Sequence, residues 1–382
     1  MYKNFVQFVQ DLYGTTDFIS LHAPQFKGNE KKYLIETIDS TFVSSVGEYV
    51  DHFEKSVADY TGAKHAIATV NGTSALHIAL LLAGVSEGDE VITQSLTFIA
   101  TCNAISYCQA DPVFVDVERS TLGLSPKCLE EFLEEHTEIK DDGFCWNKTT
   151  NKLIRACLPM HTFGHATKIE AINEVCERYN IALVEDAAES LGSYYRKRHT
   201  GTIGKTAALS FNGNKIITTG GGGMILTNDT QLAKKAKHIT TTAKKSHAWL
   251  FEHDEVGFNY RMPNLNAALG LAPMEQLPDF INNKRQHSAL YNQWFKDNNV
   301  EFVVEPEGAC SNYWLNSIVL ESRQELDDFL AYTNENKVMT RPVWTPMHRL
   351  PMFKYCQRDD LKMTNFLADR LVNIPSSVKL SE

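Results

Sequence analysis

Short apolar runs alternate with amphipathic stretches through the first two thirds of the chain. The apolar runs predict strands at residues 65–70, 90–93, 112–117, 153–160, 181–186, 207–211 and 222–228. Helical periodicity lies between some of them, at residues 71–84, 98–108 and 169–180. This alternation predicts βαβ units and a mainly parallel sheet. Continuously apolar strands such as IALVE suit a sheet that is covered on both faces.

The pattern changes towards the C-terminus. Residues 134–152 are polar and predict a surface excursion, and a long helical pattern follows Asn264, with Pro273 and Pro278 expected to break or kink it. From about residue 280 the pattern resets, with strands expected at 313–320 and 338–344 and a helix at 324–336. We therefore predict an N-terminal segment that packs on the other domains, a large domain and a small C-terminal domain, at residues 1–40, 41–275 and 276–382.

Composition and charge narrow the class of protein. The chain has 382 residues and a net charge of −10, which argues against a protein that follows nucleic-acid phosphates. It has no run of 18 apolar residues, so we expect no membrane span, and its N-terminus does not have the pattern of a signal peptide. The eight cysteines form no C-x-x-C pair, which predicts reduced thiols, a cytoplasmic location and no metal site.

Polar clusters follow several of the predicted strands, where ligands bind in open parallel sheets. Residues 71–74 (Asn-Gly-Thr-Ser) open a helix and could bind an anion, although alone they are typical of a simple helix cap. Asp186 ends an apolar strand and could either cap the next helix or pair with a cationic group. A further mixed cluster, residues 257–262, could equally be a loop with a surface arginine.

Lys215 lies between Ser210 and a run of four glycines. A lone lysine is usually solvated, but one held in a pocket can form a Schiff base. Neither G-x-x-x-x-G-K-[ST] nor a helix-opening G-x-G-x-x-G is present, so both nucleotide-loop interpretations fail. An anion site, a strand-end acid and a lysine together match what pyridoxal 5′-phosphate (PLP) needs for its phosphate, its ring nitrogen and its aldehyde.

Five segments together carry a family resemblance: VNGTSALHIAL, LTFIATCNAI, VEDAAESLGS, ALSFNGNKIITTGGGGM and GFNYRMPNLNAALG. The chain resembles, over nearly its whole length, the DegT-type PLP-dependent sugar aminotransferases. The resemblance implies an α/β fold of PLP fold type I. The chain more narrowly resembles the enzymes that aminate UDP-linked 4-keto-6-deoxy-N-acetylhexosamines for bacillosamine or legionaminic acid. This narrower resemblance lies in SFNGNKIITT, which is part of the fourth segment, and in RPVWTPMH, STFVSSVGE and VNIPSSV.

The resemblance also implies roles for individual residues around the cofactor. Lys215 would hold PLP as a Schiff base, and Asp186 would keep the ring nitrogen protonated. Glu189 would lie near the phenolic oxygen, where relatives often have Gln or His, and Phe98 would stack on the ring, although it could also be a core residue. The phosphate would be held by Thr73, Ser74, Ser210 and, from the neighbouring subunit, Asn259.

Other residues are candidates for contacts with the substrate. His161 follows the fourth strand, but a structural histidine is an equally good interpretation, and for Trp344 packing is the safer expectation. The remaining candidates are Asn212, Tyr260, Arg261, Arg341 and His348. Gly221 stands where many relatives have Glu, whereas the sugar-dehydrating relatives replace the lysine with His. Lys215 therefore argues against dehydration.

These observations predict a transaminase that moves an amino group from L-glutamate to the 4-keto group of a UDP-linked sugar. One alternative is the same reaction on a GDP- or dTDP-linked 4-keto-6-deoxy sugar, as in a perosamine synthase. Another is a PLP-binding regulatory protein without turnover, although no DNA-binding module is visible in the sequence. The resemblance further implies a homodimer with shared active sites.

Overall fold

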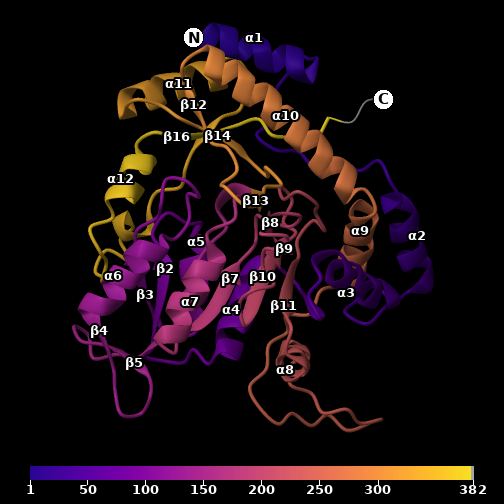
Figure 1. Cartoon of the computed structure of the whole chain (residues 1–382). Helices are drawn as coiled ribbons and strands as arrows, with labels where there is room; N and C mark the ends of the chain where they lie inside the picture. Colours follow the sequence, from indigo (N-terminus) through magenta and orange to yellow (C-terminus); the bar gives the residue numbers. More distant parts are fainter. Residues whose placement is uncertain (380–382) are drawn as a thin grey trace.

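A seven-stranded sheet organises residues 65–227 in the computed structural model, which describes residues 1–379 (Figure 1). The strand order is β1-β11-β10-β7-β6-β2-β3. β11 runs antiparallel to both β1 and β10, and the other pairs are parallel, as the alternating pattern predicts. The strands are β1 (His65–Thr69), β2 (Glu90–Gln94), β3 (Asp111–Val115), β6 (Ile154–Leu158), β7 (Ala182–Asp186), β10 (Thr206–Ser210) and β11 (Gly223–Thr227).

Helices cover both faces of this sheet. In β1, Ile67 belongs to a buried cluster with residues of α4, α5 and α8, whereas Ala66 and Ala68 pack into a second cluster with residues of α3 and α9. Near the other edge of the sheet, α6 and α7 build a third apolar cluster. The helices are α3 (Glu48–Thr61), α4 (Gly72–Ala83), α5 (Ile99–Tyr107), α6 (Pro126–His136), α7 (Ile169–Arg178), α8 (Thr230–Thr240) and α9 (Asn264–Met274).

A second, antiparallel sheet lies in the C-terminal part of the chain, with strand order β12-β14-β16-β15. Its apolar core includes residues of α1, α10 and α11. The elements are β12 (Glu301–Phe302), β14 (Asn316–Val319), β15 (Arg341–Pro342), β16 (Leu371–Ile374), α10 (Leu277–Asp297), α11 (Arg323–Glu335), α12 (Lys362–Ala368) and the 3₁₀ helix η2 (Met347–Arg349). β13 (Ala309–Cys310) pairs with β8 (Tyr194–Tyr195), and β8 pairs with β9 (Arg198–His199). This small sheet connects the C-terminal part of the chain to the part that contains the seven-stranded sheet.

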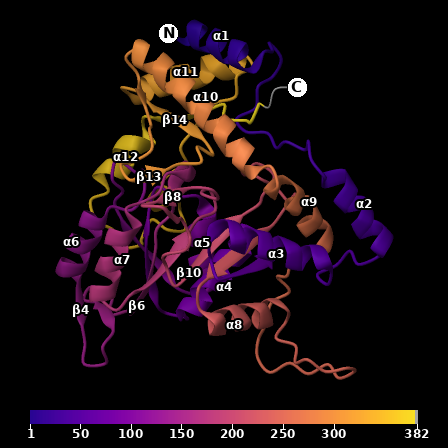
Figure 2. The same ribbon diagram turned by 45° about the vertical axis from the view of Figure 1, so that its right-hand side comes forward.

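The N-terminal segment contributes to both parts of the molecule (Figure 2). Phe5 of α1 (Tyr2–Tyr13) packs against Phe295 and Phe329, while α2 (Glu30–Ser40) lies along α9. The division at residues 275 and 276 falls between α9 and α10, and we keep it as a proposed domain boundary.

Three local predictions differ from the structure. The helical pattern after Asn264 does not reset at residue 280, because α10 continues to Asp297 and Pro278 lies in its first turn, where a missing N–H costs no helical hydrogen bond. The polar excursion at 134–152 contains a hairpin of β4 (Thr137–Ile139) and β5 (Cys145–Asn147). The strand expected at 338–344 is reduced to Arg341–Pro342.

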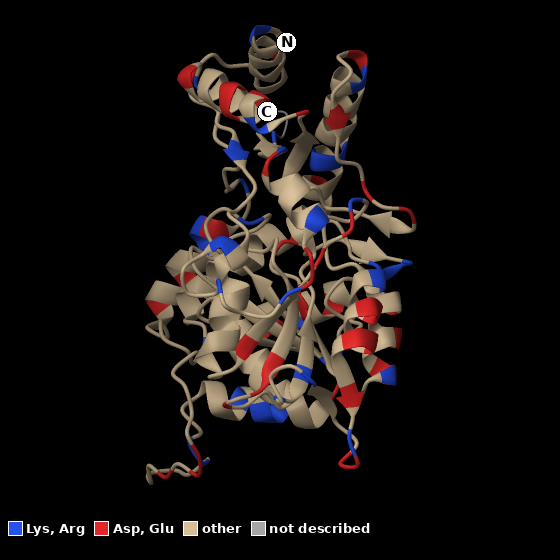
Figure 3. Ribbon diagram, turned by 90° about the vertical axis from the view of Figure 1, so that its left-hand side faces the viewer, with Lys and Arg blue, Asp and Glu red and all other residues tan. Residues whose placement is uncertain are grey.

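The surface mixes both signs of charge. In the view of Figure 3, segments of Lys and Arg and segments of Asp and Glu occur in both the upper and the lower part of the ribbon. Each helix within residues 1–379 is too short or too polar to cross a bilayer. After α8, the chain extends away from the body as a long arm, residues 241–259, before it returns to α9 (Figures 1 and 2).

Candidate active site

A pocket lies at the carboxyl ends of β1, β7 and β10, where an open α/β sheet binds its ligands. It encloses a cavity of about 290 Å³. The small C-terminal part closes one side with two tryptophans. The lining residues with polar or aromatic side chains are Asn71, Thr73, Phe98, Asp186, Glu189, Ser210, Asn212, Asn214, Lys215, Trp314 and Trp344.

The N-terminus of α4 forms one end of the pocket. The Asn71 side chain accepts a hydrogen bond from the Ser74 N–H at 2.7 Å. This cap leaves the N–H groups of Gly72 and Thr73, which have no helical partner, available to an anion. A Cβ atom at Gly72 would lie 2.9 Å from Cβ of Ser210, so glycine lets β10 come close to the helix. Thr73 and Ser210 line the cavity, whereas Ser74 is buried behind them.

Asp186 ends β7 and is only 2% exposed. Its carboxylate accepts hydrogen bonds from the Thr101 hydroxyl at 2.7 Å and from the Ala188 N–H at 3.2 Å. Burial raises the pKa of Asp186 even though both hydrogen bonds oppose the shift. The group is therefore a fixed, poorly solvated acid that a cationic ligand atom would stabilise.

Lys215 faces a second buried acid. Its Nζ lies 3.1 Å from Oε1 of Glu189 and 3.9 Å from the centre of the Trp314 ring. Burial raises the pKa of Glu189 to about 7, against the opposing influence of Lys215. The other carboxylate oxygen of Glu189 accepts a hydrogen bond from the Phe163 N–H at 2.9 Å, which fixes Oε1 towards the lysine.

Aromatic side chains form the opposite wall. Phe98 is 47% exposed, so it is not a core residue in this chain, and its ring centre lies 6.1 Å from that of Trp344. Trp344 is half-buried and also packs on Phe163 at 4.9 Å. Asn212 lines the cavity and is exposed. The structure thus gathers these three predicted residues with Thr73, Asp186, Glu189, Ser210 and Lys215.

Two candidate substrate residues, His161 and Arg261, do not line the pocket. His161 is fully buried, its Nε2 bonds the Glu185 carboxylate at 3.0 Å, and its Nδ1 accepts the Thr167 N–H at 3.2 Å. The guanidinium of Arg261 lies 2.5 Å from Glu54 and donates to the Ala68 carbonyl at 3.0 Å. Both side chains are engaged inside the protein, so neither contributes to the pocket lining of this chain.

The remaining candidates also lie outside the pocket lining. Tyr260 stacks on Phe258, and Arg341 is exposed beside Asn334. His348 bonds the Ser95 hydroxyl at 2.8 Å, and burial lowers its pKa to about 4. Asn259 lies exposed at the end of the arm. This single chain does not bring these four to the cavity.

The structure adds residues that the sequence motifs do not single out. Trp314 precedes β14 and reads as an ordinary aromatic residue of a small-domain strand. Asn214, one residue before the lysine, accepts the Trp314 Nε1–H through its carbonyl at 2.7 Å. Nothing crowds Gly221, where an added Cβ would meet only the Val70 carbonyl at 3.9 Å, so space does not explain that glycine.

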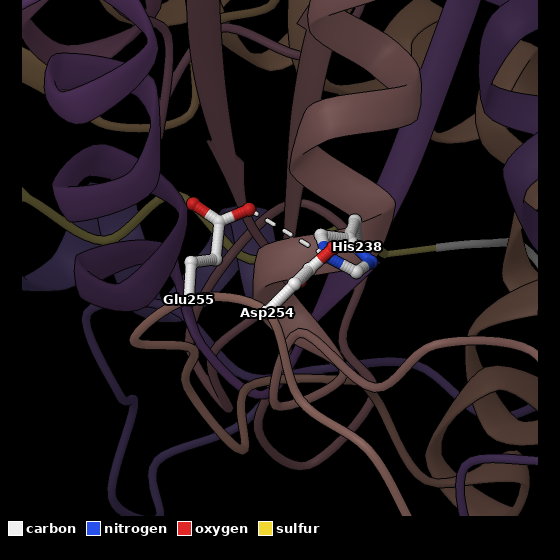
Figure 4. A group of neighbouring side chains, drawn as sticks. All are labelled: His238, Asp254 and Glu255. Atoms are coloured by element: carbon white, nitrogen blue, oxygen red, sulfur yellow. Dashed lines mark hydrogen bonds and ion pairs between the residues drawn. The ribbon is translucent and has the colours of Figure 1, made fainter.

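One group among the described residues has the composition of a metal site, and none of its members lines this pocket. His238, Asp254 and Glu255 come together between α8 and the arm (Figure 4). The Lys235 ammonium already lies 2.5 Å from Glu255, and His238 lies 2.6 Å from Asp254. These exposed carboxylates therefore already have side-chain partners within the chain.

Comparison with known proteins identifies the family to which this chain belongs. The sequence profile described as the DegT/DnrJ/EryC1/StrS aminotransferase family matches residues 24–382. The chain belongs to this family. It is a PLP-dependent sugar aminotransferase with the α/β architecture of PLP fold type I. The family is described as an aminotransferase family, which supports catalysis over the interpretation as an inert PLP-binding protein.

Similar family members cover almost the entire chain. GDP-perosamine synthase of Escherichia coli O157:H7 is 37% identical over 95% of this chain and 94% of its own length. The putative pyridoxal phosphate-dependent aminotransferase EpsN of Bacillus subtilis is 36% identical over 95% and 92%. A DegT DnrJ EryC1 StrS aminotransferase of Brucella abortus superimposes with a TM-score of 0.83, at 26% identity, over 93% of this chain and 91% of its own.

The pocket has the groups that PLP requires. Two buried acids, Asp186 and Glu189, both have raised pKa values, so they favour a nearby cation such as a protonated ring nitrogen. The available N–H groups of Gly72 and Thr73 suit a phosphate. Lys215 is the lysine that lines the cavity. The donor set of this DegT-family pocket therefore fits the cofactor.

Proposed function

We propose that this enzyme transfers an amino group from L-glutamate to the 4-keto group of a nucleotide-linked 4-keto-6-deoxy sugar. The observation that carries the proposal is the meeting of Lys215, Asp186 and the α4 N-terminus in one cavity. When bound, PLP supplies an electron sink that stabilises negative charge on the carbon next to the transferred nitrogen. The protein then has to orient the cofactor and move a proton.

Groups in the pocket carry out both tasks, the orientation of the cofactor and the transfer of the proton. Asp186 holds the ring-nitrogen proton, because its buried carboxylate is fixed by Thr101 and Ala188 and favours a cationic partner. The helix terminus at Gly72 and Thr73, with Ser210, orients the phosphate. Lys215 binds the cofactor and, once its Nζ is free, takes a proton from one carbon and returns it to the other.

The similar proteins provide support for one part of the proposal, the identity of the sugar nucleotide. GDP-perosamine synthases of three organisms are 34–37% identical to this chain over 94–95% of its length. A GDP-linked 4-keto-6-deoxymannose is therefore the substrate that we favour. The UDP-linked N-acetylhexosamine, expected from SFNGNKIITT and RPVWTPMH, becomes the second candidate.

A panel of GDP-, UDP- and dTDP-linked 4-keto-6-deoxy sugars, each supplied with L-glutamate, tests the substrate. The measured quantity is kcat/KM for the amino sugar, detected by mass. We expect the GDP-linked ketone to be preferred by at least about tenfold, since a wrong base leaves buried polar groups unpaired. If the UDP-linked ketone is preferred, the second candidate is correct, and if no ketosugar is aminated, the proposed reaction is wrong.

We further propose a homodimer that completes the site. Apolar side chains lie exposed on the N-terminal segment and on the arm, which is unusual for a surface that remains in water. They include Phe18, Phe26, Ile35, Ile38, Phe42, Trp249, Phe251 and Val256, with exposed fractions from 50% to 84%. Asn259 lies at the base of the same arm, so a partner seated there could receive it at its phosphate site.

Subunit mixing tests the shared site. An Asn259→Ala subunit mixed with a Lys215→Ala subunit forms one intact mixed site per heterodimer if Asn259 serves the partner. We expect part of the activity to return after exchange. No recovery in dimers shown to have exchanged would place Asn259 in its own chain's site.

A cytoplasmic location also remains a proposal, in line with eight cysteines that all carry free thiols.

A further inference from the structure

Lys215 occupies a defined position in the pocket. Its Nζ lies between a carboxylate oxygen of Glu189, at 3.1 Å, and the face of the Trp314 ring, whose centre is 3.9 Å away. Its side chain is 12% exposed and that of Glu189 is 1% exposed. An ammonium between a carboxylate and an indole face is stabilised from both sides, and more strongly when water is excluded.

The two sides of this position are held together by one side chain. Asn312 donates its amide hydrogens to the carbonyls of Glu189 and Leu191, both at 2.9 Å. Its oxygen accepts the Trp314 N–H at 2.8 Å. Asn312 is fully buried, so it links the backbone of the acid to the backbone of the ring.

Further contacts fix the Trp314 ring and the Glu189 carboxylate. The indole Nε1–H donates to the Asn214 carbonyl at 2.7 Å, and the buried Nζ of Lys284 donates to the Trp314 carbonyl at 3.2 Å. The Phe163 N–H that holds Glu189 comes from a residue with a φ of 56°, an uncommon left-handed conformation for phenylalanine. A preformed position of this kind needs little reorganisation when an ammonium enters it.

We propose that Glu189 and Trp314 form a docking position for the protonated Lys215 side chain while this lysine is not joined to the cofactor. The inference rests on the proposed role of Lys215 as the cofactor lysine. Over the transamination the amine must leave the cofactor in the first half and return to it at the end of the second. Docking keeps Nζ inside the pocket, next to the reacting atoms, instead of releasing a flexible side chain into solvent.

The test uses protein loaded with pyridoxamine 5′-phosphate, in which Lys215 is free. A short pulse of acetic anhydride acetylates neutral, undocked amines, and peptide mass spectrometry gives the rate at Lys215. The exposed Lys197 serves as an internal reference in every sample. The variants are Glu189→Gln, Trp314→Phe and Trp314→Leu. Trp344→Phe is the matched control, because Trp344 lines the same pocket but packs on Phe98 and Phe163.

We expect Glu189→Gln to raise the Lys215 rate by about tenfold, as loss of a charged partner does. Trp314→Leu should raise it by about threefold to tenfold, with Trp314→Phe in between, because a phenyl face keeps part of the attraction. Trp344→Phe should leave it unchanged. Pure opening of the pocket would not produce this order.

The docking position is wrong if Glu189→Gln or Trp314→Leu leaves the Lys215 rate at the wild-type value. It is also wrong if Trp344→Phe raises the rate as much as Trp314→Leu does. A separate measurement tests the assumption on which the docking position rests, namely that Lys215 is the lysine that binds the cofactor. Borohydride reduction of the PLP-loaded protein, followed by peptide mapping, should place the cofactor on Lys215, and attachment elsewhere would refute that assignment instead.

Discussion

Replacement of Arg261 separates a structural role from a role in substrate binding. In the structure, its guanidinium lies 2.5 Å from Glu54 and 3.0 Å from the Ala68 carbonyl, and the side chain is 5% exposed. Arg261→Gln would leave the Glu54 carboxylate, whose side chain is 10% exposed, without its closest cation. Breaking a buried pair from one side costs about 3–5 kcal/mol.

The lower end of that range applies here. Glu54 keeps the Lys237 ammonium at 3.2 Å and the Ala68 N–H at 2.8 Å, so we expect a loss of about 3 kcal/mol. The assay is urea denaturation of cofactor-loaded protein followed by tryptophan fluorescence. Arg341→Gln is the control, since that exposed arginine should change stability by less than about 0.5 kcal/mol. Wild-type stability of Arg261→Gln together with a raised KM for the sugar nucleotide would refute the structural role.

Three further outcomes are expected. Lys215→Ala should bind PLP without a covalent bond and lose turnover by at least about 10³-fold, as measured by absorbance and product assay, and retained covalent attachment would contradict this. Asp186→Asn should keep the fold, judged by circular dichroism, and lower kcat by about 10²-fold or more, because an amide does not stabilise the ring-nitrogen proton; near-normal turnover would speak against the role. His165 and His199 are buried, and burial lowers the pKa of each to about 4. Their neutral forms stabilise the fold fully above the unfolded pKa of about 6.5, and this stability decreases as the pH falls from there to about 4. Thermal melts from pH 7 to pH 4 should show this decline, and a flat profile would exclude it.

The sequence predicts the sheet and the centre of the site because both depend on local pattern. Each parallel strand is a short apolar run next to a helix, and the residues that follow such runs must meet at one edge of the sheet. Asp186 and Lys215 can therefore be named as candidates from the sequence, although each taken alone has an ordinary structural alternative. The insertion of β11 between β1 and β10 is different, since its two partners lie far apart in sequence and no local periodicity specifies them.

The outer parts of the site depend on contacts that sequence pattern does not encode. Arg261 pairs with Glu54, 207 residues away, and His161 pairs with Glu185, so two polar residues near the motifs face inwards. Trp314 differs from these two residues, because it lines the pocket although no motif singles it out. It looks like a strand residue of the small sheet, and only the packing of that sheet against the pocket brings its ring over Lys215.

The position of β1 has a consequence for biosynthesis. In the large sheet, β1 pairs with β11, whose residues 223–227 are made more than 150 residues later. Until then the apolar strand HAIAT has no partner strand in the sheet, and unpaired strands of this kind promote aggregation. Nascent chains that end before residue 223 should therefore depend on chaperones. Because Trp314 and Trp344 emerge later still, the cofactor pocket is completed only when synthesis is nearly over.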